Sequence, residues 1–182
     1  MINERIWDGY VTTWTEFRFL DGIIPVMRTL SRLRLPMIVV SNQSGVGRGL
    51  MGPRTLRQIT VRFVDLLARH GARIDGVYYC PHTDGNQCSC RKPKPGLLLA
   101  AARDYGIELS RSVLVGDEMR DVEAARTAGC HGILLEQDRN TTPAFGRPSS
   151  IEQGSFGTGQ VRVQRLADLP ARVAEMLDRV LV

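Results

Sequence analysis

The stretch Val113-Leu114-Val115-Gly116-Asp117-Glu118-Met119-Arg120-Asp121 indicates the class of fold. Three apolar residues followed by Gly and two acids are typical of a short strand that is buried on both faces and delivers Asp117 to its carboxyl end. Similar short runs, rich in Val, Ile or Leu, recur at residues 37–40, 77–79 and 133–135. We therefore expect a sheet whose strands are largely buried.

Segments of helical character lie between these apolar runs. Helices are expected at about residues 23–33, 53–67, 97–105, 118–128 and 169–180. Strands that alternate with helices form βαβ units. The sequence therefore predicts an α/β fold, a three-layer sandwich around a mainly parallel, Rossmann-like sheet.

The length of 182 residues predicts a single domain that spans residues 1–182. Residues 137–160 are rich in Gly, Ser, Thr and Asn without periodicity, which predicts a long mobile loop before a short edge strand at 161–163. The beginning is unusual, because residues 1–20 offer no convincing buried strand where a domain of this kind normally starts with one.

The composition is that of an ordinary globular protein, with 43% hydrophobic residues. We see neither a leader nor an apolar run of about 18 to 20 residues, so we expect a cytoplasmic protein without a membrane span. The net charge of +5 is spread along the chain, which makes nucleic acid an unlikely partner and suits a small anionic substrate. The basic residues comprise 22 Arg and only two Lys, at Lys92 and Lys94.

The strongest local pattern combines two pairs of metal-ligating residues, Cys80 with His82 and Cys88 with Cys90. Two such pairs around a short polar loop suit a tetrahedral zinc ion, with Zn–S distances of about 2.3 Å. Four protein ligands would make the site structural, because no position remains open for water. The alternatives are a disulfide, which is uncommon in a cytosolic chain, or inert thiols.

Two strand ends carry polar residues that suit phosphate chemistry. Ser41 and Asn42 end an apolar run and precede a Gly-rich turn, so their side chains and nearby backbone N–H groups could cradle a phosphate group. Asp117 and Asp121 could hold Mg²⁺, which prefers oxygen ligands. Taken singly, the first pattern could be a plain turn and the second a capping Asp with a solvated neighbour. Together with Lys92 they predict a phosphoryl-transfer site.

Six segments in the same order resemble the D,D-heptose bisphosphate phosphatases, small enzymes of the haloacid-dehalogenase type that are related to histidinol-phosphate phosphatases. The segments are Phe19-Leu-Asp-Gly, Val39-Val-Ser-Asn-Gln-Ser-Gly, Gly47-Arg-Gly, Asp75-Gly-Val-Tyr-Tyr-Cys-Pro-His, Cys88-Ser-Cys-Arg-Lys-Pro-Lys-Pro-Gly and Val115-Gly-Asp. The likeness extends to about residue 136 and includes the last helix.

The resemblance implies a magnesium-dependent phosphatase without a large cap, in which the zinc loop takes the place of a cap. The substrate would be a sugar bisphosphate, D-glycero-D-manno-heptose 1,7-bisphosphate, and the enzyme a monomer. The resemblance also assigns roles to site residues: Ser41 and Asn42 bind phosphate, Arg91 contacts the substrate, Lys92 offsets charge, and Asp117 binds magnesium with support from Asp121.

The chain departs from this family at its beginning. The family opens with a strand ending Asp-x-Asp-Gly-Thr, in which the first Asp attacks phosphorus and the second is the general acid and base. Here Met1-Ile2-Asn3 aligns with the residues at the end of that motif and beyond it, and Asp8 does not replace the missing nucleophile. We interpret this as a start codon assigned too late, and we predict that residues 1–182 alone are inactive. The alternatives are a catalytically inactive zinc-bearing domain that binds a phosphorylated ligand, and a nucleic-acid 3′-phosphatase.

Overall fold

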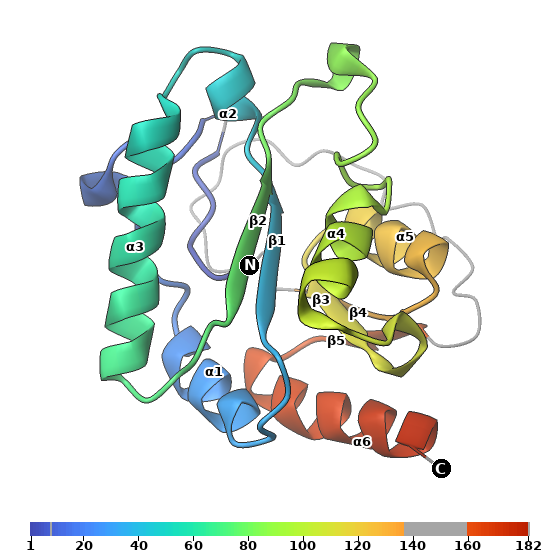
Figure 1. Ribbon diagram of the computed structural model, residues 1–182. Helices are drawn as coiled ribbons and strands as arrows, with labels where there is room; N and C mark the ends of the chain where they lie inside the picture. Colours follow the sequence, from blue (N-terminus) through green and yellow to red (C-terminus); the bar gives the residue numbers. More distant parts are fainter. Residues whose placement is uncertain (8, 137–159, 182) are drawn as a thin grey trace.

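The structure is a computed structural model that describes residues 1–7, 9–136 and 160–181 (Figure 1). The strands are β1 (Ile38–Asn42), β2 (Gly76–Cys80), β3 (Val113–Gly116), β4 (His131–Leu135) and β5 (Gln160–Val163). The α-helices are α1 (Ile23–Ser31), α2 (Ser44–Gly47), α3 (Pro53–Arg69), α4 (Gly96–Tyr105), α5 (Met119–Ala128) and α6 (Leu169–Leu181). Every strand expected from an apolar run is present, within two residues of the expected bounds.

Two predictions about the connections need correction. The Gly-rich segment after β1 is the helical turn α2 rather than a plain turn, because hydrogen bonds such as that from the N–H of Arg48 to the carbonyl of Ser44 close it. Gln160 is the first residue of β5 rather than the end of a loop, since it pairs with Gly132. The rest of the expected mobile loop, residues 137–159, lies outside the described residues, as does Asp8.

All strand pairs are parallel, as the βαβ pattern predicts. β1 pairs with β2, with Ile38 opposite Gly76, and β4 pairs with β3 on one side and β5 on the other. The strands nevertheless form two separate sheets, β1-β2 and β3-β4-β5. Within the described ranges, no strand links β1 to β3.

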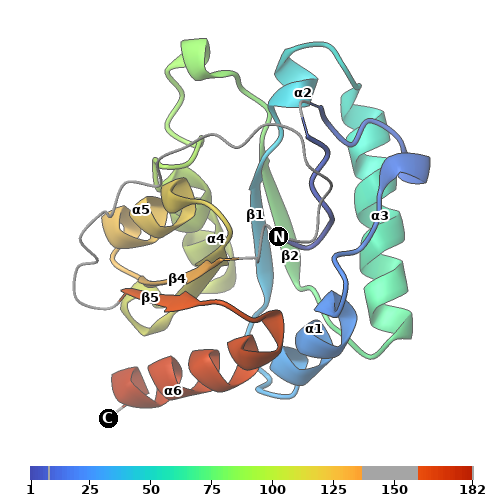
Figure 2. The same cartoon turned by 180° about the vertical axis from the view of Figure 1, so that it is seen from behind.

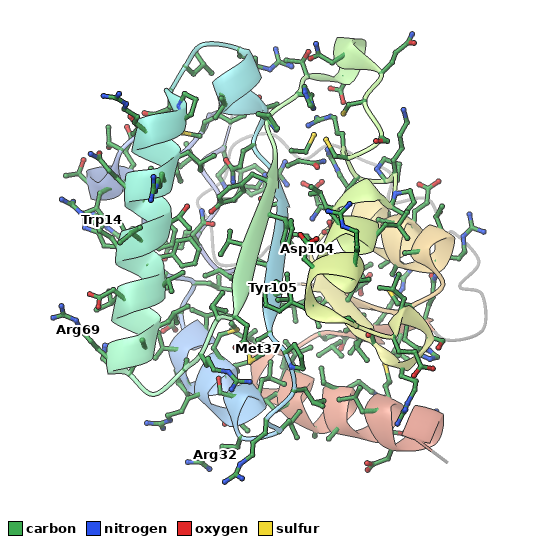
Figure 3. The ribbon with its side chains drawn as sticks, viewed as in Figure 1. Trp14, Arg32, Met37, Arg69, Asp104 and Tyr105 are labelled. Atoms are coloured by element: carbon green, nitrogen blue, oxygen red, sulfur yellow. The ribbon has the colours of Figure 1, made fainter. Side chains whose placement is uncertain are left out.

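Helices cover both faces of the sheets, which confirms the three-layer arrangement. Figure 1 shows α3 on one side of β1 and β2 and α4 on the other, with β3, β4 and β5 lying between α5 and α6. The view from behind, in Figure 2, shows the same order. Side chains of α4 attach it to β2, because the Tyr78 hydroxyl donates to Asp104 Oδ2 at 2.8 Å and Tyr105 donates to the carbonyl of Asp75 at 2.5 Å (Figure 3).

Two larger apolar clusters and one smaller cluster form the core. One lies beneath α1 and α3 and includes Ile23, Phe63 and Leu67. The second joins α6 to β4 and β5 and includes Ile133 and Leu169. The small third cluster lies where α4 meets α5. The core is therefore distributed over the two sheets rather than continuous across them.

A cavity of about 1150 Å³ lies between the two sheets. Its lining includes residues 38–42 of β1 and 113–116 of β3, so the two facing strand edges both border it. Met1 and Ile2 also line the cavity, and each packs against a different one of the two larger clusters. The open space between β1 and β3 is the feature of the fold that defines the site described below.

None of the described helices is both long enough and apolar enough to cross a membrane.

Candidate active site

The polar residues expected at the strand ends do lie together. Ser41, Asn42, Lys92, Asp117 and Asp121 all line the cavity between β1 and β3. They come from three parts of the chain, the end of β1, the loop before α4, and the segment that joins β3 to α5. The parallel topology brings these parts to the same edge, as it does for ligand sites in other open α/β sheets.

Lys92 is the residue that connects the two sides of this cavity. Its Nζ atom donates to the carbonyl of Val40 at 2.9 Å and lies 2.6 Å from Asp121 Oδ1. Only 12% of the Lys92 side chain and 8% of the Asp121 side chain are exposed. A buried ammonium therefore links β1 to the first turn of α5, with its charge matched by a buried carboxylate.

Asn42 fixes the backbone of the lysine. Its Nδ2 atom donates to the carbonyl of Lys92 at 3.1 Å, while its Oδ1 atom accepts from the N–H of Lys92 at 3.0 Å. Ser41 next to it accepts a hydrogen bond from Gln43 Nε2 at 3.1 Å. Asn42 thus has a positioning role in addition to the phosphate-binding role that the resemblance implies.

Asp121 is held against the end of β3. Its Oδ2 atom accepts from the N–H of Glu118 at 3.2 Å, so both of its oxygen atoms have a partner. A Cβ at Gly116 would lie 2.2 Å from the Cβ of Asp121, so only glycine fits there. Gly116 is therefore required because the side chain of Asp121 occupies the space that a larger residue would need.

Asp117 is the more accessible of the two carboxylates, with 34% of its side chain exposed. Its Oδ2 atom lies 3.4 Å from the backbone nitrogen of Met1, which also lines the cavity. Glu118 beside it pairs with Arg5 at 3.2 Å and with Arg120. An exposed carboxylate oxygen at a strand end is the donor that Mg²⁺ prefers, so Asp117 fits a magnesium ligand.

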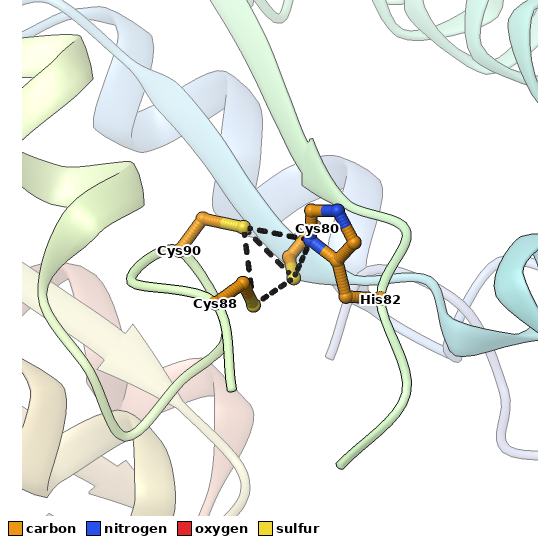
Figure 4. Close-up of side chains that lie close together, drawn as sticks. All are labelled: Cys80, His82, Cys88 and Cys90. Atoms are coloured by element: carbon orange, nitrogen blue, oxygen red, sulfur yellow. Dashed lines mark hydrogen bonds between the residues drawn. The ribbon is translucent and has the colours of Figure 1, made fainter. Parts of the chain in front are cut away.

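The four residues of the expected zinc site converge, as Figure 4 shows. The ligand atoms of Cys80, His82, Cys88 and Cys90 all lie within 4.8 Å of one another. Sulfur atoms of Cys80 and Cys88 are 3.6 Å apart, and His82 Nδ1 lies 3.3 Å from the sulfur of Cys90. Tetrahedral zinc would separate its sulfur ligands by about 3.8 Å, close to the Cys80–Cys88 distance, so the cluster could hold this ion.

The same distances argue against the alternative of a disulfide. The shortest separation between sulfur atoms, 3.0 Å from Cys90 to Cys80, is far longer than the bonded distance of about 2.05 Å. All four cysteines are free, and Cys130 lies apart from the cluster in the contact region of α4 and α5. Burial raises the pKa of the Cys130 thiol to about 11, as is typical of a structural cysteine.

The thiols of the cluster differ in acidity. Burial raises the pKa of Cys88. Hydrogen bonds from the N–H of Arg91 and from the neighbouring cysteines together outweigh burial, so the pKa of Cys88 falls to about 6. Burial and the two neighbouring thiols raise the pKa of Cys90 to about 12. The cluster therefore favours one thiolate at Cys88 near neutral pH, and a thiolate is the form that binds metals.

The loop that carries the cluster stands above the strand ends (Figure 1). Arg91 Nε donates to Asp84 Oδ1 at 2.6 Å, and its NH1 group donates to the carbonyl of His82 at 3.3 Å. Lys94 Nζ donates to the carbonyl of Cys88 at 2.8 Å. Within the part of the chain that the structure describes there is no separate cap domain, and this loop takes the covering position.

Several contacts at the site were not predicted from the sequence. The Tyr10 hydroxyl lies 3.2 Å from Ser44 Oγ, and a Cβ at Gly45 would lie 3.1 Å from the Tyr10 ring, so Tyr10 packs directly on α2. The ion pair between Asp84 and Arg91 was also not predicted, because the sequence analysis treated the residues between the two ligand pairs only as a polar loop. An acid within the zinc loop, close in sequence to an arginine, is the pattern that could have predicted this pair.

Comparisons with known proteins show the family of the chain. Residues 89–153 match the family model described as HAD-hydrolase-like. The chain is 34% identical to the D-glycero-beta-D-manno-heptose-1,7-bisphosphate 7-phosphatase of Photorhabdus laumondii, over 91% of this chain and 87% of that protein. It is 40% identical to the protein of the same name from Escherichia coli, over 74% of this chain and 75% of that protein.

A solved structure has the same fold. The D,D-heptose 1,7-bisphosphate phosphatase from B. bronchiseptica, complexed with magnesium and phosphate, aligns with a TM-score of 0.81 and 30% sequence identity. The alignment covers 96% of this chain and 93% of that one.

The parallel three-layer fold, the family-model match and these relatives together define a phosphatase of the haloacid-dehalogenase class. The chain belongs to the family of D,D-heptose 1,7-bisphosphate phosphatases within that class.

The buried ion pair gives a prediction about stability. Asp121→Asn should lower the free energy of unfolding by about 3 to 5 kcal/mol, because it leaves the ammonium of Lys92 buried without its counter-charge. The control is Asp65→Asn on α3, which breaks an exposed pair with Arg69 and should cost at most about 1 kcal/mol. Urea denaturation followed by circular dichroism measures both. Similar small losses in the two variants would contradict the proposed importance of the buried pair.

Proposed function

We propose that the protein hydrolyses a phosphate ester of D-glycero-D-manno-heptose 1,7-bisphosphate. The observation that carries this proposal is the Lys92–Asp121 pair, which places one ammonium between the end of β1 and the end of β3. Phosphoryl transfer needs little beyond positioning and charge neutralisation, and this site offers both. The names of the relatives support the sugar bisphosphate as substrate.

In this proposal the residues of the chain bind and orient the transferred phosphate group. The Ser41 hydroxyl, the Asn42 amide and the ammonium of Lys92 contact its oxygen atoms, and Asp121 keeps the ammonium in place. Asp117 is the ligand for magnesium, with Asp121 beside it. When bound, magnesium supplies further positive charge to the phosphate oxygens.

The attacking group is not evident among the described residues. The hydroxyl of Ser41 has Gln43 as its partner rather than a general base, and His82 belongs to the metal cluster. Asp121 is engaged by Lys92, and Asp117 is the proposed metal ligand. Another group must therefore attack phosphorus if the protein is an active phosphatase.

We propose that a further strand, placed between β1 and β3, brings this group. Two facing strand edges without a common neighbour, and a cavity of about 1150 Å³ between them, support the proposal. The family resemblance implies an Asp-x-Asp strand in this place. A carboxylate oxygen of the first Asp would bond to phosphorus as the bond between phosphorus and the sugar oxygen breaks. The second Asp would donate a proton to the leaving sugar oxygen. Water would then release phosphate and regenerate the carboxylate.

The cluster of Cys80, His82, Cys88 and Cys90 would hold a structural zinc ion. The convergence of four ligand atoms and the low pKa of Cys88 support this assignment. The loop would then keep a fixed shape above the substrate, which suits a role in substrate selection. Free thiols also suit a reducing compartment, so we propose that the protein works in the cytoplasm, as a monomer.

One zinc ion per chain is the expected result of elemental analysis on protein purified without chelator. Cys88→Ser should lower zinc occupancy severely, because it removes one of the four ligands, a thiol whose pKa is lowered to about 6. Cys130→Ser is the matched control, since Cys130 lies outside the cluster and should leave occupancy unchanged. Full occupancy in Cys88→Ser would contradict the assignment.

The two lysines of the chain should differ sharply in importance. In a protein that includes the nucleophile, Lys92→Ala and Asp117→Asn should each lower turnover by about 10² to 10³-fold, because each removes charge compensation at the transferred phosphate. Lys94→Ala should lower it little, since Lys94 contacts the carbonyl of Cys88 rather than the cavity. Steady-state kinetics measures all three, and equal effects at the two lysines would show that the motif is misplaced.

Residues 1–182 alone should release no phosphate above background, because no group among the described residues is free to attack phosphorus. A chain extended upstream by about 15 to 20 residues, enough for one strand and its turn, should be active. Phosphate release from heptose 1,7-bisphosphate and from an aryl phosphate, with magnesium, compares the two chains. Strong magnesium-dependent turnover by residues 1–182 would refute this account of the nucleophile, whereas inactivity of both chains would favour a ligand-binding domain.

A further inference from the structure

The net charge is distributed unevenly along the chain. Residues 1–75 contain 11 Arg and 6 acidic residues, whereas residues 76–182 contain 13 basic and 13 acidic residues. The basic residues are thus spread along the chain, but the net charge of +5 lies wholly in its first part. A charge asymmetry of this kind indicates an anionic partner.

The outward face of α3 carries much of this charge. A stripe of five exposed residues runs along it, at intervals of three or four residues, which places them on one side of the helix. The residues are Arg54, Arg57, Val61, Asp65 and Arg69. The stripe is offset from Ile59, Phe63 and Leu67, which are the buried residues of α3.

The first arginines of the stripe are not explained by the stability of α3. Arg54 is the second residue of the helix, at the end that carries partial positive charge, and Arg57 lies about one turn further on. Acidic residues stabilise this end, and α3 has none in its first turn. Neither arginine has a carboxylate partner among the described residues. The position of Arg54 therefore indicates a role other than stabilising the helix.

The same surface continues from α3 to the end of α1. The side chain of Arg28 on α1 lies against the turn after α3, because a Cβ at Gly71 would lie 3.6 Å from Arg28 Cδ. The NH2 group of Arg73 donates to the carbonyl of Leu35 at 3.1 Å. Residues 32–36, which follow α1 and are all exposed, therefore lie beside the end of α3.

We call this continuous surface the basic face. Its positive charge comes from seven arginines, of which two have a carboxylate partner among the described residues. They are Arg28, Arg32, Arg34, Arg54, Arg57, Arg69 and Arg73. Since α3 alone spans 17 residues, or about 25 Å, a small anion is too short to contact all of them. The basic face therefore suits an extended anionic surface.

Apolar side chains are interspersed with these arginines. Val61, in the middle of the stripe on α3, is 60% exposed. Leu33 and Leu35, which alternate with arginines after α1, are 40% and 42% exposed. An anionic bilayer offers phosphate groups to the arginines and an apolar layer beneath them to these side chains. The backbone of a nucleic acid offers phosphate groups without such a layer, so the combination favours lipid.

We propose that the basic face binds the surface of an anionic lipid bilayer. The contact is peripheral, because the arginines bind lipid phosphate groups and only the apolar side chains between them enter the interfacial layer. Figure 1 shows α3 on the side of β1 and β2 that faces away from α4. The basic face and the proposed phosphate site between β1 and β3 therefore lie on different sides of β1 and β2.

Co-sedimentation with large unilamellar vesicles tests this proposal on the zinc-loaded chain 1–182. One set of vesicles contains phosphatidylcholine alone, and the other contains equal parts of phosphatidylcholine and phosphatidylglycerol. The chain should sediment with the anionic vesicles and remain in solution with the neutral ones. Added salt should weaken the binding, because it screens exposed charges.

The double variant Arg54→Gln/Arg57→Gln should bind the anionic vesicles about 25-fold more weakly, since each arginine near such a surface contributes about fivefold to the affinity. Arg103→Gln/Arg126→Gln is the matched control. It removes two exposed arginines from α4 and α5, away from the basic face, and gives the same net charge. Its affinity should stay within about twofold of that of the unaltered chain.

Val61→Gln separates lipid from nucleic acid as the partner. It should weaken binding to anionic vesicles about threefold, because an apolar side chain no longer enters the interfacial layer. Binding to a short DNA duplex, measured on the same variant, should not change.

Four results would overturn the proposal. They are failure to sediment with anionic vesicles, equal losses in the two double variants, unchanged vesicle binding in Val61→Gln, and tighter binding to the DNA duplex than to anionic vesicles. Arg54, Arg57 and Val61 lie outside the lining of the cavity between the sheets, so none of these results bears on the phosphatase assignment.

Discussion

The ammonium group of Lys92 contacts the carbonyl of Val40 on one side and the carboxylate of Asp121 on the other. Val40 lies in β1, and Asp121 lies in the first turn of α5, just after β3 of the other sheet, so the contact connects parts of the fold that share no strand. Asn42 fixes the backbone of the lysine, and Gly116 leaves room for Asp121. A buried charge tolerates little displacement from its counter-charge, so the phosphate site depends on this one interaction.

The separation of the sheets gives the site its second constraint. Parallel strands that are buried on both faces normally have a neighbour on each side within the sheet, because unpaired backbone groups away from water cost about 1 to 3 kcal/mol each. Here the facing edges of β1 and β3 border a cavity instead. Ser41, Asn42 and Asp117 lie at the ends of the same two strands, so a strand placed between them would end among the groups proposed to bind phosphate and magnesium. Folding and catalysis would then require the same segment.

Much of this could be predicted from the sequence because it depends on local patterns. Short runs of Val, Ile and Leu located the strands, and the spacing of Cys80, His82, Cys88 and Cys90 located the cluster. The helical turn α2 was missed, since its two glycines disfavour a helix and its stability depends on a contact with Pro81 that is distant in sequence.

Contacts between distant elements could not be predicted in this way. The pairing of the Asn42 amide with the backbone of Lys92, 50 residues away, leaves no signal in either segment. The same holds for the contact of Tyr10 with Ser44. In each case the sequence shows the polar residue but does not indicate its partner, because the partner depends on how the elements pack in three dimensions.

Amide hydrogen exchange at β1 and β3 tests most directly whether a strand belongs between the two sheets. The amides that face the cavity should exchange rapidly in residues 1–182, while those that bond to β2 and β4 stay protected. In the chain extended upstream by one strand, the cavity-facing amides should become protected as well. Slow exchange of these amides in the short chain, or no gain of protection in the extended chain, would contradict the account.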